Sequence, residues 1–344
     1  MLAGAIGVIV AIVVLEAPPL QSTPKLVLVT GGQDFYQQGV ALGAEAAAQA
    51  HGVELEFKQL GHDDSPAAAA ALEELSRGDV HGVVVCRSVN ERAPLTVGEL
   101  SKKTKVVTCG EDVWPSHRMC HVGTGDYSAG RICAGVVKEA LPNGGRIVVL
   151  VEDAVRGPGA ARLAALRDQC IWIGGASDPH DHPPQFEVVE CLEDFGHVGL
   201  CARNMRQARS QFFDAICIVD LGDRTAGRSS IRALAPIAKS AGAKLITFER
   251  SDASLAAVAA GSVYAVIGDD PFQHGYQAID RLANFYRQGE MSFPARGRGH
   301  VNVPALVVRQ QDAAELDVQR CTASRLPTPS AAFLTISPLM LFAD

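Results

Sequence analysis

The sequence predicts an α/β protein built as two doubly wound parallel-sheet lobes. Short apolar, β-branched runs alternate with segments whose apolar residues recur at helical spacing, which is typical of βαβ units in a parallel sheet. The alternation occurs twice, before and after the turn-rich Gly123-Thr124-Gly125-Asp126. A chain of 344 residues is also long enough to bury a core in each of two domains.

The first half of the chain alternates four predicted strands with three predicted helices. The segment KLVLVT is an unbroken apolar run of the kind found in parallel strands that are covered on both faces. Gly52 and Gly78 end the first two helices. The predicted strands are 25–30, 53–60, 80–86 and 105–109, and the predicted helices are 40–51, 65–75 and 95–102.

The second half repeats this order. Its first helix has apolar residues at helical spacing, among them Ile132, Val136 and Val137, and it ends at Pro142-Asn143-Gly144-Gly145. The pattern decays from Asp312 onward, so residues 313–344 are predicted to be a tail. The further predicted strands are 146–151, 187–190, 215–219, 244–248, 264–267 and 301–308, and the helices are 159–169, 198–211, 229–241, 254–260 and 275–286.

The composition is that of a soluble globular protein. The net charge of -7 offers no basic surface for nucleic acid, so no nucleic-acid partner is expected. Nine cysteines without close-set pairs do not indicate a disulfide framework. Cys109 with Cys120, or Cys191 with Cys201, could still pair in an oxidising compartment.

The amino terminus carries an apolar stretch at residues 2–15. Its length suits the core of a signal peptide better than a bilayer span of about 20 residues. Residues 1–24 are therefore predicted to be a signal peptide or a membrane anchor, and the protein is expected in the periplasm or another extracytoplasmic compartment. The alternative is a buried first strand or a misassigned start.

No motif of catalysis or cofactor binding is found. The sequence has no phosphate-binding loop, nucleophile elbow or zinc-protease helix. The turn at Gly123 lacks the third glycine of a dinucleotide loop. Two sets of residues, Cys109, His117, Cys120 and His121, and His180 with His182, lack the ligand spacing of a structural zinc site. We expect no cofactor, no metal and no enzymatic activity.

From about Lys25 to Gln311 the chain resembles the type I periplasmic solute-binding proteins, in the ribose- and galactose-binding branch. Seven segments carry the resemblance in the family's order: DFYQQGVALGAEAAA, GDVHGVVV, KVVTCGED, GTGDYSAGRICAG, GAARLAALRD, LITFER and IGDDPFQHGYQAIDRL. The resemblance implies two lobes joined by a three-stranded hinge that close over a ligand. The implied amino-terminal lobe is 25–124 plus 270–299, and the carboxyl-terminal lobe is 125–269 plus 300–312.

The resemblance also implies binding residues. In this family the first loop supplies aromatic rings that stack on a sugar, and Phe35 and Tyr36 occupy that place, with Asp34 beside them. The alternative is that the two aromatic residues pack in the core. Arg162 matches an arginine that holds ligand hydroxyls with two hydrogen bonds, the alternative being an exposed structural arginine.

Four acidic residues complete the implied site. Asp220 occupies a place where Asn or Asp is usual, Glu249 one where Asp is usual, and Asp269 one where Gln is common. Glu111 stands in Gly110-Glu111-Asp112, where the sugar binders usually have Asp-Arg, so the ligand can differ from ribose.

The function implied is that of a monomeric, exported receptor that captures a solute for an ABC-type transporter or a sensory partner. Several carboxylates around one cleft favour donor-rich ligands, so a neutral monosaccharide or polyol is expected first, and an amino sugar or cationic metabolite second. The alternatives are a pocket used for protein contact, an enzyme, and a ligand-responsive regulator. Such regulators carry a DNA-binding head before this core, whereas here only an apolar leader precedes Lys25.

Overall fold

The computed structural model divides the chain into two compact units. The amino-terminal unit comprises Met1–Thr124 and Asp269–Pro304, and the carboxyl-terminal unit comprises Gly125–Gly268 and Ala305–Asp344. The chain therefore passes between the units three times. The residues that the structure describes are 23–32, 35–60, 65–86, 89, 93–172, 186–211, 217–221, 230–248, 251–288 and 299–312.

The amino-terminal unit contains a six-stranded sheet in the order β11-β5-β4-β3-β1-β2. All of its neighbouring strands run parallel. The reversal of strand order beside β1 is typical of doubly wound sheets. The strands are β1 (Lys25–Thr30), β2 (Glu54–Gln59), β3 (Gly82–Cys86), β4 (Lys105–Cys109), β5 (Cys120–Gly123) and β11 (Gly299–Asn302).

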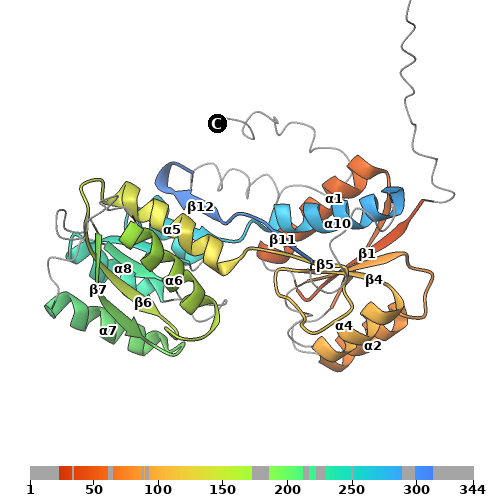
Figure 1. The fold of residues 1–344 in the computed structure, drawn as a ribbon, viewed down its shortest axis with the longest axis horizontal. Coiled ribbons are helices and arrows are strands. Elements are labelled where there is room, and N and C mark those ends of the chain that lie inside the picture. Colours follow the sequence, from red (N-terminus) through yellow and green to blue (C-terminus); the bar gives the residue numbers. More distant parts are fainter. Residues whose placement is uncertain are drawn as a thin grey trace, which may run out of the picture. The chain divides into compact units, whose positions relative to one another are not determined.

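Helices cover both faces of this sheet. In Figure 1, α1 (Phe35–His51) and α10 (Pro271–Gln288) lie on one face, and α2 (Ser65–Leu75) and α4 (Pro94–Lys103) lie on the other. Alternate residues of β1 point to opposite faces. Leu26 and Leu28 pack with α1 and α10, whereas Val27 and Val29 pack with α2 and α4. An unbroken apolar run is therefore what this strand requires.

The carboxyl-terminal unit repeats the plan with the order β12-β10-β9-β8-β6-β7. Its strands are parallel except for β12, which runs antiparallel to β10. The strands are β6 (Gly145–Val151), β7 (Phe186–Glu193), β8 (Cys217–Asp220), β9 (Lys244–Thr247), β10 (Ala265–Gly268) and β12 (Leu306–Arg309).

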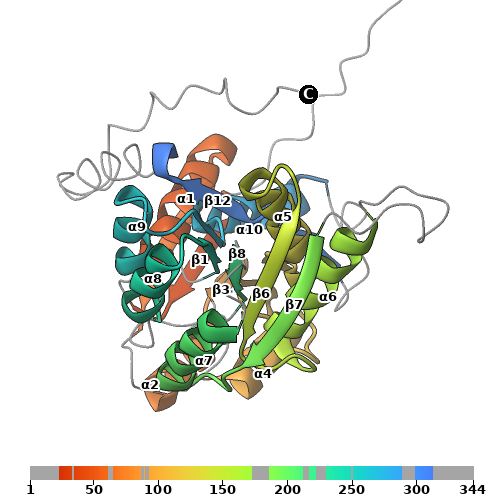
Figure 2. The same ribbon diagram turned by 90° about the vertical axis from the view of Figure 1, so that its left-hand side faces the viewer.

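Helices cover both faces of the second sheet as well. Figure 2 shows α6 (Gly157–Trp172) on one side of β6 and β7, and α7 (Val198–Gln211), α8 (Ile231–Ser240) and α9 (Asp252–Ala259) on the other. The helix α5 (Asp126–Ala140) packs with α6 against Ile147 and Val149, while Val148 and Leu150 face α7 and α8. The predicted fold class, two doubly wound parallel-sheet lobes, is confirmed.

One strand prediction was wrong, and one strand was missed. The apolar run 301–308 forms β11 and β12, which belong to different sheets. Pro304 lies between them and has no N–H to offer a sheet. The short strand β5 was not predicted, because it has four residues and one of them is His121.

The connection from β4 to β5 differs from the others. Both strands are parallel, yet residues 110–119 join them without a helix. Thr108 and His121 lie opposite each other in this strand pair and alternate with residues that pack under α1 and α10. The loop therefore lies where a covering helix is expected, and polar contacts described below fix it in place.

Among the described residues, no helix has both the length and the apolar character needed to cross a membrane. The predicted leader before residue 23 and the predicted tail at 313–344 lie outside the described residues.

Candidate functional site

The site is built at the carboxyl ends of the parallel strands, where doubly wound sheets bind ligands. In the amino-terminal unit these ends bring together Gly31 after β1, Cys86 at the end of β3, the turn at Gly110 after β4, and Thr124 after β5. We call this the amino-terminal binding edge. The first turn of α1 begins beside it, since β1 leads directly into that helix.

Tyr36 lies in the first turn of α1 with its hydroxyl directed into the unit. The hydroxyl oxygen is 2.8 Å from Nδ1 of His274 and 4.0 Å from Sγ of Cys109. The partly buried ring packs against the core under α1 and α10. Burial raises the pKa of Tyr36 well above its ordinary value, and Cys109 and Asp269 raise it further. The side chain is therefore a neutral phenol held from inside, and stacking on a ligand stays a prediction.

Two of the predicted residues belong to segments near this edge. Asp269 precedes α10 and is partly exposed, and its negative charge contributes to the raised pKa of Tyr36, after burial and Cys109. Glu111 is exposed in the turn after β4, next to Gly110, whose positive φ of 81° suits glycine. Their carboxylates can accept hydrogen bonds from hydroxyl groups.

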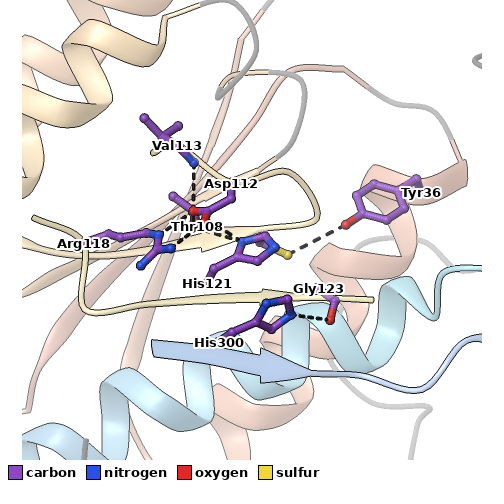
Figure 3. A network of polar contacts seen from close by, with 9 residues as sticks. Tyr36, Thr108, Asp112, Val113, Arg118, His121, Gly123 and His300 are labelled. Atoms are coloured by element: carbon purple, nitrogen blue, oxygen red, sulfur yellow. Dashed lines mark hydrogen bonds and ion pairs between the residues drawn. The ribbon is translucent and has the colours of Figure 1, made fainter. Parts of the chain in front are cut away.

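Asp112 turns back from the edge and fixes the loop between β4 and β5. Its carboxylate accepts hydrogen bonds from Thr108 Oγ1 at 3.0 Å and Val113 N at 2.8 Å, and both its oxygens pair with the buried guanidinium of Arg118. Burial favours a higher pKa for Asp112, but the Arg118 hydrogen bond, His121 and the Arg118 charge outweigh burial and lower it. Figure 3 shows Arg118 and Val113 converging on this carboxylate.

His121 lies beneath the same loop. Its Nδ1 is 3.1 Å from Thr108 Oγ1 and 3.8 Å from Asp112 Oδ1, and its ring packs edge to face on His300 at 5.0 Å between centroids. Burial lowers the pKa of His121 to about 4, although Asp112 acts in the opposite direction. His121 is therefore neutral at pH 7, and this polar layer stabilises the loop rather than holding a ligand.

Arg162 is buried at the carboxyl edge of the second sheet. Its Nη1 donates to the Leu221 carbonyl oxygen at 3.2 Å, and its Nη2 pairs with Asp126 Oδ1 at 2.8 Å. The guanidinium carbon lies 4.5 Å from the centre of the Phe248 ring. Its Nε is buried and, within the described residues, has no hydrogen-bond partner. The side chain is not an exposed arginine, and its planar head is held rigidly at the ends of β8 and β9.

Asp220 ends β8 and is fully buried. Its Oδ2 accepts hydrogen bonds from Ser230 Oγ at 3.2 Å and Thr247 Oγ1 at 3.3 Å. The carboxylate thus joins β8, β9 and the start of α8. Contact between Asp220 and a ligand stays a prediction.

Phe195 lies in the turn after β7 and was not predicted from the sequence as a site residue. The residue is 60% exposed and has a φ of +48°, followed by Gly196 at +75°. His197 N donates to the Asp194 carbonyl oxygen at 2.8 Å and closes the turn. Such turns favour Asn-Gly, and a non-glycine residue with positive φ costs about 1–2 kcal/mol. An exposed aromatic ring held at this cost, after the carboxyl end of a parallel strand, indicates a function.

The remaining predicted residues cannot be placed. Asp34 and Glu249 lie outside the described residues, as do His180 and His182. Phe35 begins α1, but its side chain is likewise outside them. Among the residues that the structure describes, no group of three or more His, Cys, Asp or Glu side chains is arranged to hold a metal. Cys109, Cys120, Cys191 and Cys201 are free thiols.

Comparison with known proteins agrees with this geometry. Residues 25–290 match the family model described as the periplasmic binding protein domain. No curated protein sequence matches the chain. Among solved structures, the arabinose-binding protein AraP from Geobacillus stearothermophilus is 18% identical, with a TM-score of 0.69, and the alignment covers 86% of this chain and 99% of AraP.

Two further structures are similar. A periplasmic ribose ABC transporter protein from Conexibacter woesei DSM 14684 is 17% identical with a TM-score of 0.66, over 88% of this chain and 98% of that one. XylFII, solved as a mutant complex with LytSN, is 17% identical with a TM-score of 0.68, over 85% and 99%. At such identities the structures show a shared fold. The family match covers most of the chain, and the protein therefore belongs to the periplasmic binding protein family, whose members are non-enzymatic solute-binding proteins.

Proposed function

We propose that this protein is an exported receptor that binds a neutral monosaccharide or polyol through residues that follow the carboxyl ends of its parallel strands. The observation that carries the proposal is Phe195, an exposed aromatic ring kept in a strained turn after one such strand. Sugars present apolar C–H faces that stack on aromatic rings, and a rigid aromatic anchor binds at a low cost in conformational entropy. The similar structures of an arabinose-binding and a ribose-transport protein support this ligand class.

The polar residues favour a neutral ligand. Glu111 and Asp269 at the amino-terminal binding edge accept hydrogen bonds from hydroxyl groups and repel anions. Within the described part of the chain, Nε of Arg162 is left as a donor for one more acceptor, while the two other guanidinium nitrogens are engaged by Leu221 and Asp126. A sugar supplies both donors and acceptors. An amino sugar is the second candidate, since its ammonium group suits the two carboxylates.

The receptor is proposed to act outside the cytoplasm, with residues 1–24 as its export signal or anchor, and to pass its ligand to an ABC-type transporter. A sensory partner is the second possibility. The similarity to XylFII, a protein solved in complex with LytSN, supports a role for a second protein.

A thermal-shift screen tests the proposed ligand class, because a ligand that binds only the folded state raises its stability. The panel is arabinose, ribose, xylose, galactose, inositol, glucosamine, putrescine, glucuronate and ribose 5-phosphate. We expect stabilisation by at least one neutral sugar or polyol. Stabilisation by glucuronate or ribose 5-phosphate, and by none of the neutral or cationic compounds, contradicts the proposal.

A further inference from the structure

The first turn of α10 contains a fully buried histidine, His274, that joins two residues far from it in the sequence. Its Nδ1 is 2.8 Å from the Tyr36 hydroxyl, and its Nε2 is 3.2 Å from Thr124 Oγ1. The Tyr36 and His274 rings also meet edge to face, with centroids 5.9 Å apart. One side chain therefore contacts the start of α1 and the residue that follows β5.

The two hydrogen bonds of the ring depend on each other. A neutral imidazole donates from one nitrogen and accepts at the other, whereas hydroxyl groups can do either. If Tyr36 donates to Nδ1, then Nε2 donates to Thr124. If Tyr36 instead accepts from Nδ1, then Thr124 donates to Nε2. Reversing one bond reverses the other, so the three residues form one directed chain of hydrogen bonds. We call Tyr36, His274 and Thr124 the relay.

The position of His274 is fixed by the packing of α1 on α10. A Cβ atom added to Gly43 of α1 would lie 1.9 Å from the Phe272 carbonyl oxygen, and one added to Gly275 would lie 1.9 Å from the Val40 carbonyl oxygen. The two backbones are therefore in direct contact. His274 lies between these contact residues in α10, so the close packing of the helices fixes its backbone, and its side chain is fully buried.

The two ends of the relay lie at the amino-terminal binding edge and at a chain crossing. Tyr36 lies in the first turn after the loop that leaves β1, at the amino-terminal binding edge. Thr124 is the last residue of the amino-terminal unit before the chain passes into the other unit at Gly125. A hydrogen bond at each end restrains the first turn of α1 and a chain crossing through the same side chain.

We propose that His274 is a positioning residue, which holds Tyr36 for ligand binding and ties its position to Thr124 at the first crossing. The part that concerns the ligand rests on the proposed function. The claim that His274 restrains α1 and the first crossing does not depend on the proposed function.

Two substitutions separate the arms of the relay. In His274→Asn the amide ends at the level of Nδ1, so the arm to Tyr36 can be kept and the arm to Thr124 is lost. In His274→Gln the amide reaches the level of Nε2, so the arm to Thr124 can be kept and the arm to Tyr36 is lost. The matched control is His51→Asn, which removes another hydrogen bond between α1 and α10, the 2.9 Å contact of His51 Nε2 with Asp280 Oδ1.

Hydrogen exchange of the ligand-free full chain is measured first. We expect His274→Gln to speed amide exchange at the start of α1, and His274→Asn to speed it at residues 122–126. Titration with the sugar identified by the thermal-shift screen follows. Losing one hydrogen bond corresponds to about a fivefold change in affinity. We expect His274→Gln to weaken binding by about fivefold, and His274→Asn and His51→Asn to change it by less than about twofold.

Exchange rates that rise equally across the unit in all three variants would show a merely structural role and overturn the proposal. So would equal affinity in His274→Gln and His274→Asn. If no sugar binds the wild-type chain, the proposed function fails. The segment-specific exchange then decides the remaining claim alone: the expected pattern supports the relay, and its absence overturns it.

Discussion

Acidification should destabilise the protein through His121, and the size of the effect follows from its surroundings. Burial lowers the pKa of His121 from 6.5 to about 4, although the charge of Asp112 acts in the opposite direction. The unfolded chain therefore takes up a proton first as the pH falls. Stability is fully present above pH 6.5, is lost progressively as the pH falls toward 4, and is not regained below it.

The magnitude can be worked from these two values. Each factor of ten in proton affinity corresponds to about 1.4 kcal/mol, so the full effect is about 3 kcal/mol. About 2 kcal/mol of this is lost by pH 5, because the unfolded histidine is then almost fully protonated and the folded one is not. The lowered pKa of Asp112 adds a further loss in more acidic solution, since its contribution is present above its unfolded pKa and disappears below it.

The assay compares wild type with His121→Gln in urea unfolding at pH 7.5 and pH 5.0. A Trp172→Phe background leaves Trp114 as the reporter of the amino-terminal unit, because the sequence contains two tryptophans. Wild type should lose about 2 kcal/mol more than the Gln variant between the two pH values. His117→Gln, an exposed position in the loop between β4 and β5, should behave as wild type. An equal loss in wild type and His121→Gln would refute the reasoning.

Three further predictions concern single residues. Phe195→Asn should raise the free energy of unfolding by about 1 kcal/mol because Asn tolerates positive φ, and it should weaken sugar binding because Asn has no ring. A calorimetric measurement of lower stability in this variant would show that the turn is not strained. Gly275→Ala should lower the free energy of unfolding in urea by several kcal/mol, because the added Cβ would meet the backbone of α1. The control Gly98→Ala, whose Cβ would have nothing within 4 Å, should raise it by about 0.5–1 kcal/mol. A tolerated Gly275→Ala would contradict the close contact between the helices. Asp112→Asn should lower the free energy of unfolding by about 3–5 kcal/mol because it leaves the buried Arg118 without a charged partner. A loss below about 1 kcal/mol in urea unfolding would argue against a tight pair.

The alternation of strands and helices was predictable because the core of each unit is made by local patterns. KLVLVT has apolar residues facing both helical layers, so its burial is encoded in six consecutive letters. The run VNVPALVV has the same local appearance but crosses from one sheet to the other. Its division at Pro304 depends on tertiary structure, which a local pattern does not contain.

The candidate site was predictable only in its location. The family resemblance supplied Glu111, Arg162 and Asp269 as candidate residues, and their contact with a ligand stays a prediction. The local pattern could not identify His274, because the hydrogen bonds of His274 join residues 238 and 150 positions away. The positive φ of Phe195 also results from the turn that it forms with Gly196, and the dipeptide Phe-Gly was the one local signal for it.

Isothermal titration of the purified chain with ribose or arabinose, and with ribose 5-phosphate, tests the account most directly. The account predicts saturable binding of a neutral sugar at one site per chain, weakened in Phe195→Asn, and no binding of the phosphorylated sugar. Binding of ribose 5-phosphate without binding of any neutral sugar, or full sugar affinity in Phe195→Asn, would contradict the proposed site.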